Sequence, residues 1–425
     1  MKFKEYKGLD LPGLAADVLK EWDAQDTFHK SISTREGHPT FVFYEGPPSA
    51  NGTPGIHHVM ARTIKDIFCR YKTQQGYLVH RKAGWDTHGL PVELGVEKKL
   101  GITKEDIGRT ISIEEYNRAC REAVMEYTGL WEELTRKMGY WVNMDDPYIT
   151  YDNKYIETLW WLLKQLFDKG LLYKGYTIQP YSPAAGTGLS THELNQPGCY
   201  RDVKDTTCTA QFRIIRDAKS EKLFGDAEGP LYFLAWTTTP WTIPSDQAVS
   251  LKPGAAYVAV EHEGRAEVML EDLAPKCCEE FGWEYTPVMV DGKPYVVPAE
   301  TFHHIHYKQP IFDGVEGVAL LADYVGVDDG TGIVHNSPGH GVDDYFACLK
   351  EGITDICMPV DDDGKFYTGE EFGTGGPFSG MDTDEANPHI IEFLRERGTL
   401  VLEKKITHSY PHCWRCKNPI IFRTT

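Results

Sequence analysis

The sequence predicts an α/β protein in which a parallel, Rossmann-type sheet is interrupted by an inserted β-rich domain. Between residues 40 and 91 a strand, a loop, a helix and a second strand follow one another, as in a βαβ unit. From residue 200 to about 394, short runs rich in Val, Thr and Tyr are separated by Gly and Pro turns. The 425 residues also exceed the usual size of one domain.

These changes in pattern predict four segments. We expect a helical extension over residues 1–38 and the first half of a nucleotide-binding domain over 39–199. The β-rich insertion follows over 200–394. Residues 395–425 then return to the nucleotide-binding domain.

Each element of the first half has its own signal. Apolar residues at helical spacing predict a helix over Leu14–Trp22. "TFVFYEG" predicts a buried strand that ends at Gly46, and a helix follows from Met60 with Gly76 just beyond its end. "YLVHRKAGWDTHGLP" predicts a second strand that runs into a loop. The carboxyl ends of parallel strands meet at one sheet edge, so both loops should lie together where ligands bind.

Two more helices are expected further along the first half. Ser112 and Glu115 form a capping box before one helical run that continues to Met138. Asp152 can cap another helix, which Gly170 closes.

Composition limits the classes of function. Lys and Arg total 44 against 63 Asp and Glu, a net charge of -19 that counts against a nucleic-acid binder, although a local basic patch would suffice. The sequence contains neither a signal-peptide core nor a run approaching the roughly 20 apolar residues of a membrane span. Ten scattered cysteines do not form a secreted disulfide framework. We expect a cytoplasmic monomer without membrane attachment.

The loop "GPPSANGTPGIHHVM" has the properties of a phosphate-binding loop. Gly52 and Gly55 leave space for backbone N–H donors, and the following helix presents its positive end. His57 and His58 add donors for phosphate oxygens in a transition state. The alternative is a well-capped loop with two ordinary polar histidines.

Two stretches carry a resemblance to a known family. "GPPSANG…H…KD" is similar to the signature region of class I aminoacyl-tRNA synthetases, and "RKAGWDTHGLPVE" resembles the isoleucine-specific members. The resemblance implies an isoleucine–tRNA ligase that uses ATP with Mg²⁺, isoleucine and tRNA-Ile. A valine- or leucine-specific relative is the rival, and residues 85–91 argue against it.

The resemblance also assigns residues in the first half. The family's His-aliphatic-Gly-His signature falls on Gly55, Ile56, His57 and His58, so the first histidine and the glycine are replaced here. We therefore expect His57 to take over the missing phosphate contact. The implied assignments are as follows: catalytic, His57 and His58; ATP-binding, Asn51, Gly52, Gly55, His57 and His58; isoleucine-binding, Gly46, Pro47 and Asp86. For Asp86 the alternative is a turn cap.

A second chemistry is implied for the insertion. Isoleucine and valine differ by one methylene, worth only about 1–3 kcal/mol, a limit known from this enzyme family itself. The family removes valine by hydrolysis at a second site. "AWTTTPWTIPSDQA" and "GTGIVHNSPGHGVDDY" resemble that editing site.

The resemblance gives the editing residues separate roles. Asp344 would hold the substrate ammonium, and Thr237, Thr238 and Thr239 would position water and the terminal ribose. His335 would shape a small pocket. The alternatives are a plain threonine-rich strand, a strained turn, a metal site with non-standard spacing, and a free-standing hydrolase of mischarged tRNA formed by residues 200–394.

Cys413 and Cys416 have zinc-knuckle spacing. In relatives a second cysteine pair stands where this chain has Ser182 and Ala185, so we expect two spare thiols rather than zinc. The resemblance further implies a Lys-Met-Ser-Lys-Ser loop and an anticodon-binding domain, which residues 1–425 lack. We therefore interpret the chain as an incomplete fragment that does not form isoleucyl-adenylate at a normal rate.

Overall fold

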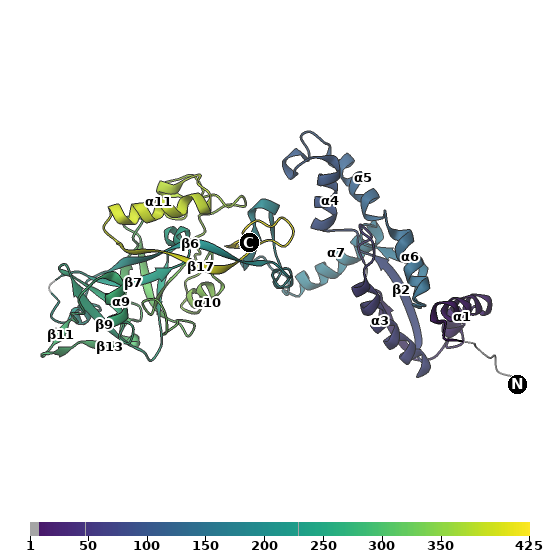
Figure 1. The fold of residues 1–425 in the computed structure, drawn as a ribbon, viewed down its shortest axis with the longest axis horizontal. Coiled ribbons are helices and arrows are strands. Elements are labelled where there is room, and N and C mark those ends of the chain that lie inside the picture. Colours follow the sequence, from purple (N-terminus) through teal and green to yellow (C-terminus); the bar gives the residue numbers. More distant parts are fainter. Residues whose placement is uncertain (1–7, 47, 228) are drawn as a thin grey trace. The chain divides into compact units, whose positions relative to one another are not determined.

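The computed structural model describes residues 8–46, 48–227 and 229–425. The protein forms two compact units, Met1–Lys174 and Gly175–Thr425 (Figure 1). The predicted boundaries at residues 199 and 394 both fall within the second unit, and they stay predictions. No helix in the described ranges is long and apolar enough to cross a membrane.

The first unit contains the predicted parallel sheet. Its strands β1 (Thr40–Tyr44), β2 (Leu78–Trp85) and β3 (Asn143–Ile149) are parallel and lie in the order β1-β2-β3. The helices are α1 (Leu11–Gln25), α2 (Thr27–Ser33), α3 (Ile56–Gln74), α4 (Leu90–Leu100), α5 (Ile113–Val124), α6 (Thr128–Lys137) and α7 (Asn153–Asp168). The α3 helix connects β1 to β2, which confirms the βαβ unit.

Helix α3 buries its polar side. Met60, Ile64, Ile67, Phe68 and Tyr71 are more than half exposed, while the buried residues of the helix are Arg62, Asp66, Cys69 and Thr73. The cause is a set of ion pairs beneath the helix. Asp66 contacts Arg70 at 2.6 Å and Arg81 of β2 at 3.5 Å. Buried charges of this kind are stable only when they are paired.

The prediction of a single helix from Ser112 to Met138 is wrong, because the structure has two helices there, α5 and α6. The capping box is present, and Ser112 Oγ accepts a hydrogen bond from the Glu115 N–H at 3.1 Å. The helix stops at Val124, and the Tyr127 N–H donates to the Ala50 carbonyl at 3.1 Å instead of continuing the helix. This bond ties the turn to the loop that precedes α3. Asp152 is the N-cap residue of α7, but its side chain makes no capping bond.

The second unit is built on a ten-stranded mixed sheet in the order β13-β9-β10-β7-β6-β14-β15-β8-β16, with β17 paired to β6. Its strands are β6 (Tyr200–Ile214), β7 (Leu231–Thr237), β8 (Ala248–Leu251), β9 (Ala256–His262), β10 (Arg265–Leu270), β13 (Val296–Pro298), β14 (His306–Lys308), β15 (Glu316–Leu321), β16 (Ile333–Asn336) and β17 (Leu400–Pro411). This sheet confirms the β-rich prediction.

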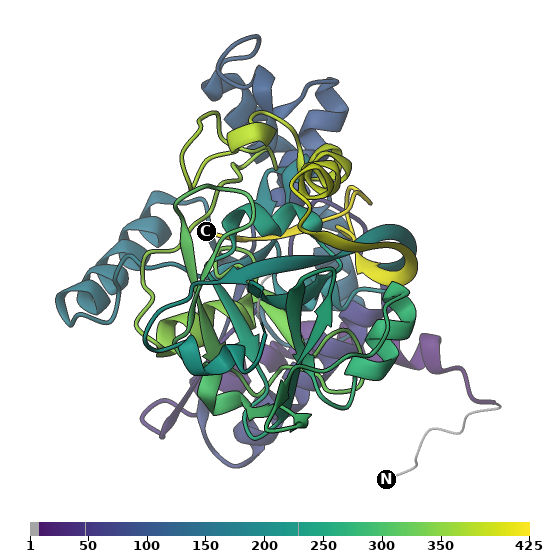
Figure 2. The same cartoon turned by 90° about the vertical axis from the view of Figure 1, so that its left-hand side faces the viewer.

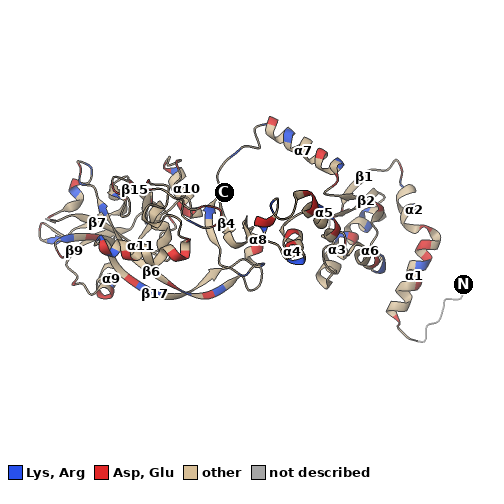
Figure 3. Cartoon of the chain, turned by 90° about the horizontal axis from the view of Figure 1, so that it is seen from above, with Lys and Arg blue, Asp and Glu red and all other residues tan. Residues whose placement is uncertain are grey.

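Shorter elements complete the second unit. They are α8 (Thr191–Leu194), α9 (Ala274–Phe281), α10 (Val342–Lys350), α11 (Thr383–Glu396), β4 (Ile178–Ser182), β5 (Thr187–Gly188), β11 (Met289–Val290), β12 (Lys293–Pro294) and β18 (Ile421–Thr424). Helix α11 lies along β6 and β17 (Figure 1) and is seen nearly end-on in Figure 2. Acidic and basic side chains are interspersed along β17 and α7 (Figure 3).

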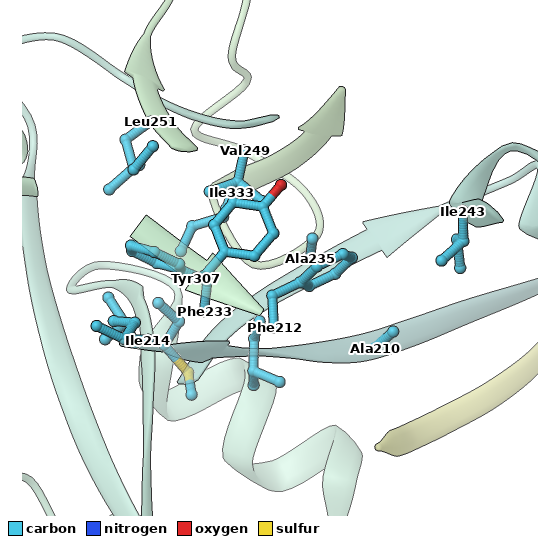
Figure 4. Close-up of a cluster of buried hydrophobic side chains, with 14 of the residues drawn as sticks. Ala210, Phe212, Ile214, Phe233, Ala235, Ile243, Val249, Leu251, Tyr307 and Ile333 are labelled. Carbon is cyan, nitrogen blue, oxygen red and sulfur yellow. The ribbon is translucent and has the colours of Figure 1, made fainter. Parts of the chain in front are cut away.

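The core of the second unit lies between its sheet and helices (Figure 4). Tyr307 packs edge-on against Phe212 and Phe233, with ring centroids 5.5 and 6.0 Å apart. Its hydroxyl donates to the fully buried carboxyl of Asp246. Asp246 in turn contacts His335, which lines the pocket described below.

Candidate functional site

The two predicted loops of the first unit lie side by side at the carboxyl end of the parallel sheet. Ser49 forms a bridge with Asp86, whose N–H donates to the Pro48 carbonyl at 3.1 Å. Trp131 closes the same region and donates from Nε1 to the Gly52 carbonyl at 2.9 Å. Gly46 and half-buried Asn51 belong to this loop, whereas Pro47 lies outside the described residues.

The histidine pair opens helix α3. The Gly55 N–H donates to Nδ1 of His58 at 2.9 Å, and the His58 ring packs edge-on against Trp131 at 4.7 Å. Burial, followed by the neighbouring His57, lowers the pKa of His58 below its ordinary value. The exposed ring of His57 lies 3.8 Å from that of His58. At pH 7 the His58 ring is therefore neutral, and its Nδ1 is already used as an acceptor.

Gly55 and His57 are structurally linked. A Cβ at position 55 would lie 2.8 Å from Cε1 of His57, closer than such contacts occur. A histidine at position 55, as in the family signature, would require the exposed ring of His57 to move. Whether the two departures from the signature are coupled can be measured with a double-mutant cycle.

Charges beneath the loop are neutralised within the protein. The Glu45 carboxylate is buried, pairs with Lys65 and accepts a hydrogen bond from the Tyr140 hydroxyl. Lys65 also donates to the Gly46 carbonyl at 3.3 Å. Lys65 therefore fixes the loop to α3. The Asp86 carboxylate, in contrast, accepts a 3.3 Å bond from the His88 N–H, the pattern of a turn cap.

The second unit contains a pocket of about 300 Å³ that gathers all five predicted editing residues. It is lined by Trp236, Thr237, Thr238, Thr239, Thr242, Val334, His335, Ser337, His340, Gly341 and Asp344. They come from the end of β7, the following 3₁₀ helix (Pro240–Ser245), β16 and the start of α10. Residues more than 100 positions apart in the sequence thus meet in one cavity.

Asp344 accepts hydrogen bonds from neutral groups alone. Its Oδ2 accepts from the Ser337 N–H at 2.9 Å, and its Oδ1 lies 3.3 Å from the donating Tyr324 hydroxyl. Burial raises the pKa of the Asp344 carboxyl above its ordinary value. Such a carboxylate gains free energy when a cation binds beside it.

His335 is held between two side chains that the sequence did not single out. Its Nδ1 lies 3.2 Å from Asp246 Oδ1, and its Nε2 lies 2.9 Å from Thr242 Oγ1. Thr242 uses its proton toward the Thr239 carbonyl at 2.8 Å, so its oxygen accepts from His335. Nε2 of His335 therefore carries a proton, and the ring is fixed in orientation.

His340 also lines the pocket; the sequence named it only in the metal alternative with His335 and Asp344, and not among the editing residues. Its Nδ1 donates to the Phe422 carbonyl at 2.9 Å, whereas its buried Nε2 has no hydrogen-bond partner among the described residues. Burial lowers the pKa of His340 to about 4, so the ring is neutral at pH 7 and Nε2 keeps a free lone pair. Because this nitrogen is itself buried, its unpaired acceptor lies behind the pocket wall and does not face the cavity.

The threonines and glycines shape the pocket backbone. The Thr239 N–H donates to Thr237 Oγ1 at 3.1 Å, which turns the chain at the end of β7. A Cβ at Gly341 would lie 2.5 Å from Oδ2 of Asp344. A Cβ at Gly339 would lie 2.3 Å from the Cys357 carbonyl. Both glycines are needed for this packing, which places Asp344 against the pocket.

Comparisons with known proteins show the family of this chain. Residues 17–390 match the family described as tRNA synthetases class I (I, L, M and V). The chain belongs to the class I tRNA synthetases. Proteins named isoleucine–tRNA ligase from Porphyromonas gingivalis and Bacteroides fragilis are 49% and 50% identical to it, each over 99% of this chain. Each alignment covers 41% of the relative, so the chain spans about two fifths of their length.

One solved structure, titled "The crystal structure of GlLeuRS-CP1", is 14% identical, with a TM-score of 0.38. It covers 47% of this synthetase chain and 99% of its own. A likeness this weak supports no functional statement.

The cysteine pair of this synthetase does not form a complete zinc site. Cys413 is buried, and Cys416 Sγ lies 3.5 Å from the Ser182 hydroxyl. Within the part of the chain that the structure describes, no third His, Cys, Asp or Glu joins them in a metal-binding group. A structural zinc wants about four ligands, so the donors present do not fit this ion.

The residues that sequence reasoning missed left only weak signals. Thr242 and Asp246 lie within the quoted "AWTTTPWTIPSDQA", and His340 lies within "GTGIVHNSPGHGVDDY". Their neighbours in the sequence do not reveal which of them turn toward the cavity. That information comes from β8 and β16, which pair in antiparallel register beside the 3₁₀ helix.

Proposed function

We propose that this chain belongs to an isoleucine–tRNA ligase that also hydrolyses valyl-tRNA. Family membership and the printed names of the two relatives support the ligase reaction, in which ATP with Mg²⁺ activates isoleucine for transfer to tRNA-Ile. The observation that best supports the hydrolysis of valyl-tRNA is one pocket lined by Thr237, Thr238, Thr239, His335 and Asp344. We place the enzyme in the cytoplasm as a monomer.

In the first unit, we assign phosphate contacts to the start of α3. Asn51, Gly52 and Gly55 provide the approach, and His57 and His58 stand at the positive end of the helix. Gly46, Pro47 and Asp86 would receive isoleucine. The carboxylate of Asp86 would pair with its ammonium, a charge-assisted contact worth roughly 1.5–3 kcal/mol.

In the second unit, Asp344 would bind the ammonium of the mischarged amino acid. The attacking water would add to the ester carbonyl while the tRNA hydroxyl leaves, and His340 would line the pocket beside it. His335 is already bonded through both ring nitrogens, so we assign it a positioning and size-limiting role. The threonines would orient the ribose and water.

The experiment is hydrolysis of valyl-tRNA-Ile by the protein and by Asp344→Asn. Loss of the ammonium contact should lower kcat/KM by about 10- to 100-fold. Asp343→Asn is the matched control, because Asp343 is exposed and does not line the pocket. An Asp344→Asn variant as active as Asp343→Asn would reject the assignment. Hydrolysis in an intact enzyme that shows no isoleucine-dependent pyrophosphate exchange would instead favour the free-standing hydrolase.

A further inference from the structure

A second cluster of polar side chains in the second unit lies outside the editing pocket. His303 and His304 follow the 3₁₀ helix Ala299–Phe302, and Glu351 is the C-cap residue of α10. The Nε2 atoms of His303 and His304 lie 3.3 and 2.8 Å from the same oxygen, Oε2 of Glu351. Among the described residues, these three form a group of His, Cys, Asp or Glu side chains that could hold a metal ion, because their ligand atoms all lie within 4.8 Å of one another.

A tight turn at His303 and His304 brings the imidazole rings of these two neighbouring residues to the same carboxylate. The Ile305 N–H donates to the Phe302 carbonyl at 3.0 Å, and His303 has φ -58° and ψ 125°. His304 has φ 62°, in the left-handed region. These angles are those of a type II turn, whose third position normally holds Gly or Asn. A histidine there is held at a cost in free energy.

The surrounding structure fixes this turn. The His304 N–H donates to the Ala319 carbonyl at 2.7 Å, and Lys219 Nζ donates to the His304 carbonyl at 3.0 Å. The two imidazole rings lie 3.8 Å apart. The turn therefore presents both rings to Glu351 as a preformed unit.

Hydrogen bonding leaves part of the cluster unsatisfied. Nε2 of His304 donates to the Glu351 carboxylate at 2.8 Å. The buried Nε2 of His303 has no hydrogen-bond partner among the described residues, despite its 3.3 Å approach to the carboxylate. When His304 releases its Nε2 proton to solvent on metal binding, two nitrogen lone pairs and one carboxylate oxygen match the donor set of three-ligand zinc sites, in which water takes the fourth position.

An ion could reach the cluster from solvent. The side chain of His304 is 48% exposed, and with Glu351 it lines a surface cleft of about 510 Å³. Asp217, Lys219 and His306 line the same cleft. Because Lys219 is bonded to the His304 carbonyl, its ammonium is occupied there.

We propose that His303, His304 and Glu351 form a binding site for a divalent transition-metal ion, with Zn²⁺ as the test ion. The site does not depend on the editing or ligase chemistry. A bound ion would tie the turn after Phe302 to the end of α10 and so stabilise the second unit.

The test uses tag-free protein freed of metal with a chelator and titrated with Zn²⁺ in a calorimeter. We expect one ion per chain with a dissociation constant in the micromolar range, and a Zn²⁺-dependent rise in unfolding temperature. Glu351→Gln and His304→Asn should each weaken Zn²⁺ binding at least about tenfold. Changing a residue that only supports a metal ligand already costs about tenfold or more in affinity, so loss of a ligand itself should cost at least as much. Asn suits the left-handed position, so His304→Asn keeps the turn.

His306→Asn is the control, because His306 belongs to β14 and faces Glu316 at 3.7 Å rather than Glu351. It should leave binding unchanged. Co²⁺ substitution should give ligand-field bands without thiolate charge transfer. No binding by the parent protein, equal binding by the Glu351→Gln and His304→Asn variants, or a thiolate spectrum lost in Cys413→Ser would each overturn the proposal.

Discussion

The two units of the chain bury charge in opposite ways. In the first unit, buried acidic groups are paired with cations: Glu45 with Lys65, and Asp66 with Arg70 and Arg81. In the second unit, the buried carboxyls accept from neutral donors or from histidine. Asp344 accepts from Ser337 and Tyr324, and Asp246 from Tyr307 beside His335.

This difference indicates which charge each site can accept. In the first unit the acidic groups below the loop are already neutralised, so the positive end of α3 can act on an anion such as phosphate. In the second unit, burial raises the pKa of both Asp246 and Asp344, and no Lys or Arg among the described residues forms an ion pair with either carboxyl. A ligand that carries its own positive charge complements that pocket.

The largest expected effect concerns Glu267, a third carboxyl of the second unit. It is fully buried, its Oε1 accepts from Gln211, and its Oε2 has no partner. Burial raises the pKa of Glu267 to about 8. The pKa of Glu267 in the folded protein thus exceeds its ordinary value of 4.5. Burying this side chain therefore costs no ionisation free energy below pH 4.5, and the free energy of unfolding falls as the pH rises from 4.5 toward 8.

In the parent protein we expect the free energy of unfolding to fall by several kcal/mol between pH 5 and about pH 8. Glu267→Gln should abolish this fall, because glutamine has the same shape as glutamate and does not ionise. Urea unfolding at a series of pH values measures the effect. Glu261→Gln changes an exposed residue of the neighbouring strand β9 and should leave the pH dependence as it is. A Glu267→Gln variant whose stability falls with pH as steeply as the parent's would show that Glu267 is not the source.

The next effect tests how Asp344 is positioned. Gly341→Ala would place a Cβ 2.5 Å from the Asp344 carboxylate and displace it. We expect valyl-tRNA hydrolysis to fall by about 10- to 100-fold, close to the effect of losing the ammonium contact itself. Gly326→Ala is the control, because a Cβ there meets nothing within 4 Å. Equal hydrolysis by both alanine variants would contradict the proposed position of the carboxylate.

The sequence predicted much of this arrangement, and its failures have physical causes. The family resemblance of two stretches predicted that Thr238 and Asp344 share one site, and one pocket is lined by both. The apolar stripe of α3 predicted a helix but not which side it buries, since Arg81 and Asp66 decide that from separate elements. Asp246 could not be recognised, because its role comes from the core residue Tyr307, 61 positions away.

The smallest effect concerns the exchange of Gly55 and His57 in the signature. If His57 supplies one phosphate contact, His57→Ala in the intact enzyme should lower isoleucine-dependent pyrophosphate exchange by about 3- to 10-fold, because a hydrogen bond made by a solvent-exposed side chain contributes about 1 kcal/mol. His80→Ala, an exposed residue of β2, is the control and should have no effect.

The link between the two positions can be measured separately with a double-mutant cycle. Gly55→Ala should be harmful because its Cβ would displace the His57 ring, which lies 2.8 Å away. Once that ring is removed, the added methyl group meets little resistance. The double variant should therefore lose no more activity than His57→Ala alone. Fully additive losses would show that Gly55 acts on the nucleotide directly, as an unobstructed stretch of backbone, and that the two departures from the family signature are independent.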